Sequence, residues 1–186
     1  MIIIPLVILL IVYAGICAAR AITDIRQFES PCLCVLGDEH SVGLAPYLSR
    51  WADYRGISFV FDAAPNRRVR QQRLSKVALD SVVFVSLGTA EAGTPEDTVD
   101  ELAFQSFVLA LNAFGTKQIV WLLPPSTAQL LGLARVRDTI RKLGVTVVQT
   151  TAEMSTNGLH PVDYSRLFID VEPVLRASFG ELHSAL

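Results

Sequence analysis

The chain has 186 residues and a formal net charge of -2 at pH 7. This length suits one globular domain of roughly 150 residues with an appendage, so a single hydrophobic core is expected. The basic residues are scattered, apart from a small group at Arg67, Arg68, Arg70 and Arg73. The chain therefore lacks the concentrated positive charge of a nucleic-acid-binding protein, and we expect no nucleic-acid partner.

Residues 1–20 predict one transmembrane helix, because no charged residue precedes Arg20. At 1.5 Å per residue the apolar stretch is roughly 27 Å long, close to the hydrocarbon core of a bilayer at about 30 Å. A cleaved signal peptide is the alternative, but it normally begins with positive charge and has a shorter apolar stretch. We expect a single-pass membrane protein. Arg20 and Arg26 follow the span and favour a cytoplasmic domain, although two charges leave the side open.

After a linker at residues 21–31, the domain at residues 32–186 alternates short apolar runs with longer amphipathic stretches. The runs have the length and β-branched content of strands buried on both faces, and they cover residues 32–37, 57–61, 81–88, 118–123 and 145–150. Helical spacing is found over residues 40–56, 69–80, 95–115, 126–144 and 160–182. This alternation predicts an α/β fold with five parallel strands in a three-layer, doubly wound, flavodoxin-like sheet.

Cys32 and Cys34 lie two residues apart in the first predicted strand. Their side chains then share one face with Cα atoms about 7 Å apart, which is poor geometry for a disulfide. No cluster of further Cys or His residues lies near them in the sequence. We therefore expect buried free thiols, no metal site and no cofactor.

The turns after the strands carry the most informative residues, because ligands bind at the carboxyl ends of the strands in such a sheet. Four turns read GDEHSVG (37–43), DAAPNRRVR (62–70), SLGTAEAG (86–93) and STNGLHPVDYSRL (155–167). In this order and spacing they resemble the SGNH hydrolases, also called the GDSL esterase/lipase superfamily. The resemblance extends from about residue 32 to residue 170 and implies an SGNH hydrolase-like fold.

The resemblance also implies a site at five positions of this chain. The first turn of the family carries a nucleophilic serine, and the matching residue is Glu39. A glycine after the second strand gives its backbone N–H to the oxyanion, and the matching Asn66 keeps the N–H but lacks the freedom of glycine to adopt positive φ. An asparagine after the third strand is a further oxyanion donor, and Ala90 replaces it. The acid and base of the triad correspond to Asn157 and His160.

These substitutions predict a degenerate site with no intact catalytic set. A glutamate at position 39 places negative charge beside an incoming carbonyl group and has no hydroxyl that could be acylated. Removing one oxyanion donor typically costs about 10² to 10³ in rate. The resemblance therefore implies a pseudoenzyme in which only His160 is kept.

Other roles for residues near this site stay open. Ser41 is a candidate for a displaced nucleophile, although serine in the first helical turn commonly caps N–H groups. Glu39 and His160 are candidates for activating water, with Glu91 near the same rim. The simplest expectation is that Glu39 and His160 form an ion pair, or that Glu39 faces the positive end of the first helix.

We therefore expect a membrane-anchored domain that has lost catalysis and serves as a structural or binding subunit, with a protein partner, in a cell envelope or a lipid-containing virion. The alternative is an active membrane-bound ester hydrolase, acting on an acetylated sugar, peptidoglycan or lipid ester through Glu39 and His160. We expect His40 at the surface and His183 in a C-terminal tail. The group Arg67 to Arg73 is expected to be solvated, or to contact an acidic partner or lipid headgroups.

Overall fold

A computed structural model describes residues 31–180 of the chain. The predicted transmembrane helix at residues 1–20, nearly all of the predicted linker, and His183 lie outside the described residues. Between residues 31 and 180 no helix is both long and apolar enough to cross a membrane.

Five strands form one parallel sheet, as the apolar runs predict. They are β1 (Cys32–Gly37), β2 (Ser58–Ala63), β3 (Val82–Ser86), β4 (Gln118–Leu122) and β5 (Thr146–Val148). Their order is β2-β1-β3-β4-β5, and every neighbouring pair is parallel. All residues of β1 and β3 are buried, which accounts for their continuous apolar sequence. The strand order reverses between β1 and β3, and a doubly wound sheet binds ligands at such a point.

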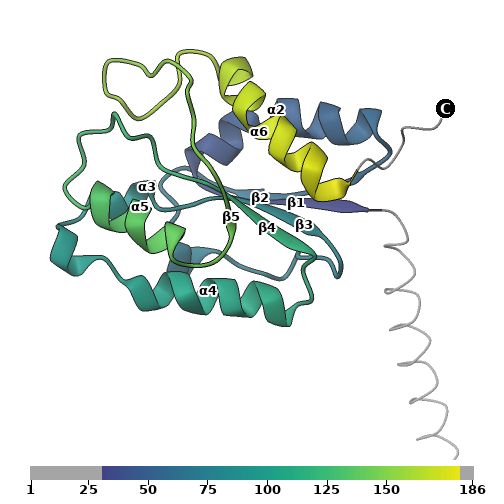
Figure 1. Ribbon diagram of the computed structural model, residues 1–186, viewed down its shortest axis with the longest axis horizontal. Helices are drawn as coiled ribbons and strands as arrows, with labels where there is room; N and C mark the ends of the chain where they lie inside the picture. The colour runs from purple at the N-terminus through teal and green to yellow at the C-terminus, as the bar shows by residue number, and fades with distance from the viewer. Residues whose placement is uncertain (1–30, 181–186) are drawn as a thin grey trace, which may run out of the picture. The chain divides into compact units, whose positions relative to one another are not determined.

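Helices cover both faces of the sheet and make three layers (Figure 1). One face is covered by α2 (Glu39–Tyr54) and α6 (Tyr164–Phe179). The other face is covered by α3 (Thr89–Ala92), α4 (Glu101–Ala113) and α5 (Leu133–Arg141), and two 3-10 turns, η1 (Val69–Gln71) and η2 (Glu96–Thr98), lie in the connections. Each helical layer packs its own apolar core against the sheet, so the predicted three-layer arrangement is confirmed.

The connection between β2 and β3 does not form the helix predicted over residues 69–80. It contains η1 and then irregular chain. The buried side chain of Gln72 donates to Asp62 Oδ2 at 3.1 Å and to the Arg73 carbonyl oxygen at 3.0 Å. The bond to Asp62 joins this stretch to β2 and does not depend on the helical spacing of the stretch. The amphipathic spacing of this stretch was therefore misleading.

Three other helices begin later than their spacing predicts, and one of them is α6, which starts at Tyr164. Helix α4 starts at Glu101, because the Asp100 carboxylate accepts from the Ala103 N–H at 3.1 Å and caps the helix there. Helix α5 starts at Leu133. The loop before α5 contributes instead to the carboxyl edge of the sheet, where Leu130 lines a cavity.

Cys32 and Cys34 are buried and free, as predicted. Their Sγ atoms lie 3.7 Å apart, because alternate residues of a strand share one face. Both belong to the core between the sheet and the layer that contains α4 and α5. They therefore contribute to packing.

Candidate functional site

The candidate site lies at the carboxyl edge of the sheet, where β1, β2 and β3 end side by side. The strand register pairs Gly37 with Ala63 of β2 and with Ser86 of β3. The turns that follow these three residues are thus brought together, although they are far apart in the sequence. This is the edge at which a doubly wound sheet carries its chemistry.

Gly37 lets the turn after β1 approach β3 closely. Its φ is 155°, and a Cβ atom there would lie 2.6 Å from the Ser86 carbonyl oxygen. The Asp38 N–H donates to that oxygen at 2.8 Å, and Ser86 Oγ donates to Asp38 Oδ1 at 2.8 Å. The Ser41 N–H donates to Ser86 Oγ at 2.9 Å. The first turn is therefore bonded tightly to the end of β3.

Asp38 caps helix α2 from a buried position. Its Oδ1 accepts from the His40 N–H at 3.1 Å, as expected of an N-cap carboxyl group. The side chain is 1 % exposed, and Oδ2 has no hydrogen-bond partner within residues 31–180. Burial, followed by the neighbouring charge of Glu39, raises the pKa of Asp38 to about 7. A large fraction of this carboxyl group is thus protonated near neutral pH.

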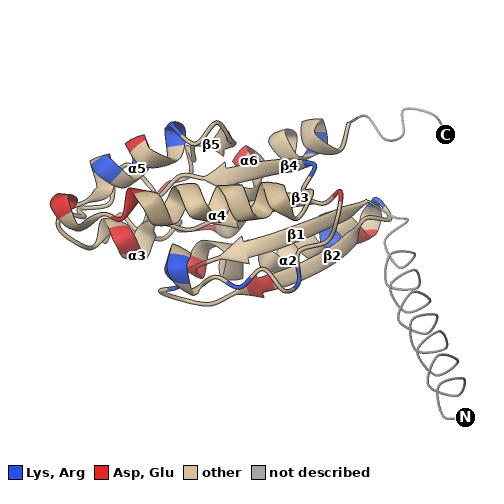
Figure 2. Cartoon of the chain, turned by 90° about the horizontal axis from the view of Figure 1, so that it is seen from below, with Lys and Arg blue, Asp and Glu red and all other residues tan. Residues whose placement is uncertain are grey.

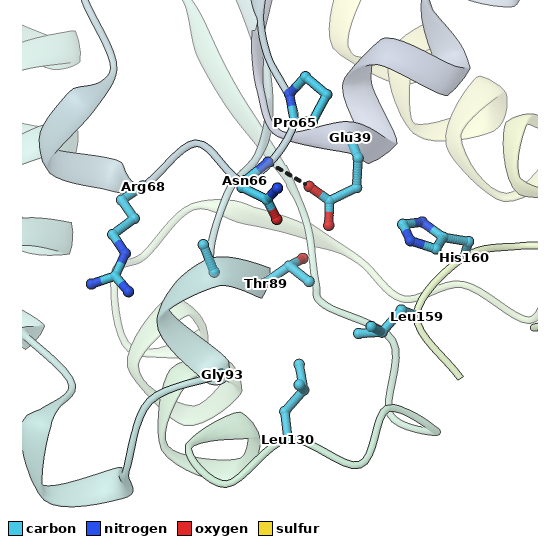
Figure 3. A pocket seen from close by; sticks show the side chains of 10 residues that line it. Glu39, Pro65, Asn66, Arg68, Thr89, Gly93, Leu130, Leu159 and His160 are labelled. Atoms are coloured by element: carbon cyan, nitrogen blue, oxygen red, sulfur yellow. Dashed lines mark hydrogen bonds between the residues drawn. The ribbon is translucent and has the colours of Figure 1, made fainter. Parts of the chain in front are cut away.

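Glu39 is the first residue of α2, and its side chain reaches across to the turn after β2 (Figure 3). Its Oε2 accepts a hydrogen bond from the Asn66 N–H at 3.1 Å. Asn66 has a φ of 57°, in the left-handed region that asparagine adopts more readily than most residues. The position thus has a positive φ although Asn66 lacks the conformational freedom of glycine. The N–H that the resemblance assigns to an oxyanion is bonded to a carboxylate of the protein itself.

One cavity of about 520 Å³ joins these residues. Its lining includes Glu39, Asn66, Ala90 and His160, which were singled out in the sequence. The remaining lining residues are Pro65, Arg68, Thr89, Gly93, Leu130 and Leu159 (Figure 3). The structure thus brings residues from the connections after all five strands to one place.

Asn157 is the one of the five predicted positions that does not line the cavity. Its Oδ1 accepts from the Ser155 hydroxyl at 2.6 Å and from the Leu159 N–H at 2.9 Å, with a longer contact of 3.4 Å to the His160 N–H. The amide oxygen therefore stabilises the turn that precedes His160 through backbone contacts. Among the described residues, Asn157 makes no hydrogen bond to the His160 ring.

His160 and Glu39 face the same cavity without forming the expected ion pair. The ion pairs found between residues 31 and 180 do not include these two side chains. Glu39 lies instead in the first turn of α2, where the helix dipole favours negative charge. Glu39 thus lies at the positive end of the first helix, which was the second of the two expected arrangements.

His40 is buried, so the expectation of a surface residue is wrong. Its side chain is 2 % exposed, and its ring centroid lies 5.9 Å from that of His160 and 6.5 Å from that of Tyr164. Within the described part of the chain neither ring nitrogen has a hydrogen-bond partner. Burial lowers the pKa of His40 to about 4, so the ring is neutral at pH 7. The spacing of His40, Leu44 and Leu48 on the buried face of α2 was a signal that could have revealed this.

We expect His40 to make the protein less stable in mild acid. The pKa of His40 is lowered from 6.5 to about 4. The folding stability that depends on a neutral His40 is therefore complete above pH 6.5 and is lost as the pH falls towards 4. Between pH 7 and pH 5 the loss is about 2 kcal/mol. His40→Phe should remove this pH-dependent loss. The difference in unfolding free energy between variant and wild type, measured by urea titration, should therefore change by about 2 kcal/mol between pH 7 and pH 5. The raised pKa of Asp38 acts in the opposite direction in both proteins and cancels in this difference. An unchanged difference would contradict the buried, neutral state of His40.

Ser41 and Glu91 are both structural. Ser41 is fully buried, and its hydroxyl donates to the Leu36 carbonyl oxygen at 3.1 Å, which excludes it as a displaced nucleophile in this arrangement. Glu91 is 8 % exposed and does not line the cavity. Its Oε1 accepts from the Val69 N–H at 2.7 Å, and burial raises its pKa. The expectation of a Glu91 carboxylate at the rim is therefore wrong.

The group Arg67 to Arg73 lies after β2, at the same edge of the sheet as the cavity. Arg67 forms an ion pair with Asp62 at 2.8 Å, and Arg70 pairs with Asp100. Arg68 lines the cavity. Figure 2 shows Lys and Arg distributed over the chain with Asp and Glu between them. Two of these arginines thus have acidic partners within the domain.

No three His, Cys, Asp or Glu side chains of the described residues gather in a way that could hold a metal ion. The polar groups of the cavity are instead one carboxylate, one imidazole, one guanidinium and the amide and hydroxyl groups of Asn66 and Thr89. Such a set can bind a ligand by hydrogen bonds and charge.

Comparison with models of known protein families finds no match, and neither does comparison with curated protein sequences. Two solved structures are similar in fold. A candidate acylhydrolase from Bacteroides fragilis has a TM-score of 0.58 and 10% sequence identity, covering 85% of this chain and 95% of its own. A candidate GDSL-like lipase from Parabacteroides merdae has a TM-score of 0.53 and 12% identity, covering 76% of this chain and 93% of its own. The domain therefore has the SGNH hydrolase fold, as its turn motifs predict.

Proposed function

We propose that this chain is a membrane-anchored SGNH hydrolase-like protein that has lost its catalytic residues and serves as a structural or binding subunit of a membrane-associated assembly. One observation supports the loss of catalysis most strongly. The carboxylate of Glu39 accepts the hydrogen bond of the Asn66 N–H at 3.1 Å. A negatively charged group of the protein thus uses the donor that an oxyanion would need.

The other positions support the same proposal. A substrate carbonyl that approached Asn66 would meet the charge of Glu39, and stabilisation of a developing oxyanion requires donors, not a second anion. Ala90 has no side-chain donor, although it lines the cavity. Asn157 bonds to backbone N–H groups, so it does not orient the imidazole of His160 as a carboxylate would. A fold can be kept as a scaffold when its chemistry is lost.

The membrane anchor in this proposal rests on the sequence of residues 1–20, which is long and apolar enough to span a bilayer. Strand β1 begins at Cys32, so residues 21–31 would form a short connection between bilayer and domain. The assembly in this proposal is a cell envelope or a lipid-containing virion. The partner in this proposal is another protein of that assembly.

A second candidate function is ester hydrolysis by atypical residues. Glu39 and His160 line one cavity, so a water molecule between them could be activated by either side chain. The substrate would be an acetylated sugar, peptidoglycan or a lipid ester. Release of nitrophenol from short-chain esters by the purified protein would favour this candidate over the first.

Deletion of residues 1–26 is expected to convert the protein from a membrane-bound to a soluble, folded form. The domain from residue 31 onwards has its own two apolar cores, so the anchor is not needed for packing. The measurement is the distribution of full-length and shortened protein between membrane pellet and supernatant, with circular dichroism of the soluble fraction. A shortened protein that stays in the pellet while folded would contradict a single anchor at residues 1–20.

A further inference from the structure

The carboxylate of Glu39 has unused capacity to bind a cationic group. Only Oε2 is bonded, to the Asn66 N–H, and within residues 31–180 no cation forms an ion pair with this side chain. Glu39 is half-buried and lines the cavity. An ionised carboxylate offers about four acceptor positions on its two oxygens. Oε1 is therefore free to accept from a ligand.

No cationic side chain between residues 31 and 180 pairs with the negative charge of Glu39. The adjacent carboxyl group of Asp38 adds negative charge when it is ionised. Burial, and then the charges of Glu39 and Asp38, raise the pKa of Tyr164. Burial keeps His40 neutral. Arg68 lines the cavity, but its side chain extends away from Glu39 (Figure 3). His160 also lines the cavity but forms no ion pair with Glu39. The carboxylate of Glu39 is thus able to accept from a positively charged ligand.

Apolar side chains line the same cavity as this carboxylate. Leu130 and Leu159 line the cavity from the loops that follow β4 and β5, together with Pro65 (Figure 3). The two loops approach closely at Gly158, which has a φ of 67° and where a Cβ would clash with the Thr127 carbonyl oxygen. A cavity with apolar side chains and one carboxylate fits a ligand with an alkyl stem that ends in a cation.

A bare metal ion does not fit this site, because Glu39 is the only carboxylate in the cavity lining and metal ions need several oxygen ligands. Resting on the proposed binding function, we propose that the cavity binds an alkylammonium group, the end of a lysine side chain of a partner protein. The ammonium group donates to Glu39 Oε1, and the alkyl stem packs on Leu130 and Leu159. The pocket of an esterase fold has thereby become a lysine-binding pocket.

Titration of the full-length, 15N-labelled protein in uncharged detergent with n-butylammonium tests this inference. We expect saturable shifts of the Asn66 and Leu159 amide signals with a dissociation constant on the order of 1 to 10 mM. 1-Butanol, which has the same stem without the charge, should bind roughly fivefold or more weakly. Methylammonium, which lacks the stem, should bind about threefold or more weakly. Equal binding of all three, or no binding of butylammonium, would overturn the proposal.

Matched variants separate the site from general charge effects. Glu39→Gln should weaken butylammonium binding roughly fivefold or more, whereas Glu96→Gln, the same change at an exposed residue of η2, should leave it unchanged. Equal loss in both variants would refute the pocket. If Glu39→Gln does not fold, the comparison of butylammonium with 1-butanol in the wild type still decides.

The source of the ammonium group is tested with two further ligands. Nα-acetyl-lysine amide, which keeps its side-chain ammonium group, should bind at least as well as butylammonium. Ethanolammonium, the end group of a common lipid, should bind more weakly. The reverse order would overturn the assignment to a protein side chain. Ester turnover measured on the same sample keeps the two proposals apart. Turnover together with ammonium binding would contradict only the loss of catalysis. The absence of both turnover and binding would contradict only the lysine-binding pocket.

Discussion

Gly37→Ala is expected to destabilise the protein by about 3 to 5 kcal/mol. A Cβ at this position would lie 2.6 Å from the Ser86 carbonyl oxygen, which is backbone and cannot move without disturbing β3. The φ of 155° adds strain for any residue with a side chain. The bonds that join Asp38 and Ser41 to Ser86 would lengthen or break as the turn moves away. Urea unfolding monitored by circular dichroism measures this loss.

Gly144→Ala is the matched control for this variant. Gly144 also has a positive φ, of 71°, but a Cβ there would meet no atom within 4 Å. It should cost only about 1 kcal/mol, the price of the backbone conformation alone. Equal losses for the two variants would show that the close approach of the first turn to β3 contributes little to stability.

Glu39→Ser alone is expected to leave ester cleavage undetectable. The hydroxyl would be free of the Glu39 charge and the Asn66 N–H would become available, but Ala90 would still lack a donor. Each missing oxyanion donor costs about 10² to 10³ in rate. His160 would also lack an orienting carboxylate, a loss of about 10⁴ in the best-studied serine protease. Ser155 and the backbone occupy the one acceptor oxygen of Asn157.

The joint variant Glu39→Ser, Ala90→Asn and Asn157→Asp is expected to cleave nitrophenyl esters measurably. Aspartate at 157 has a second acceptor oxygen in place of the amide nitrogen, so one oxygen can keep the Leu159 N–H while the other accepts from the imidazole. Asn66 needs no replacement, because its φ is already 57°. Cleavage by the single variant Glu39→Ser at the rate of the joint variant would show that the other positions are not deficient.

Much of the fold could be predicted because burial on both faces imposes a local signal. The apolar runs that became β1 and β3 are continuous, since neither face of these strands contacts water. The stretch at residues 69–80 has a helical spacing but forms only η1. There the decisive interactions join Gln72 to Asp62 of β2, a contact between two elements that no local pattern contains.

The candidate site could be located from the sequence but not described. Each of the turns after β1, β2, β3 and β5 carries a recognisable motif, and parallel strands bring such turns to one edge. The hydrogen bond from Asn66 to Glu39 joins residues of different turns, and it depends on the left-handed conformation of Asn66. Burial of His40 likewise depends on the packing of Tyr164 over α2, where Gly43 leaves room for the ring. Both features arise from contacts between residues far apart in the sequence, which no local pattern contains.

Ester hydrolysis by the unmodified, full-length protein tests the loss of catalysis most directly. We expect no release of nitrophenol from short-chain esters above the uncatalysed rate, because the Asn66 N–H is bonded to Glu39 and no hydroxyl stands at the position of the nucleophile. Glu39→Gln and His160→Ala should then behave as the wild type does. Robust hydrolysis by the wild type that disappears in both variants would show instead that Glu39 and His160 carry out a reaction of their own.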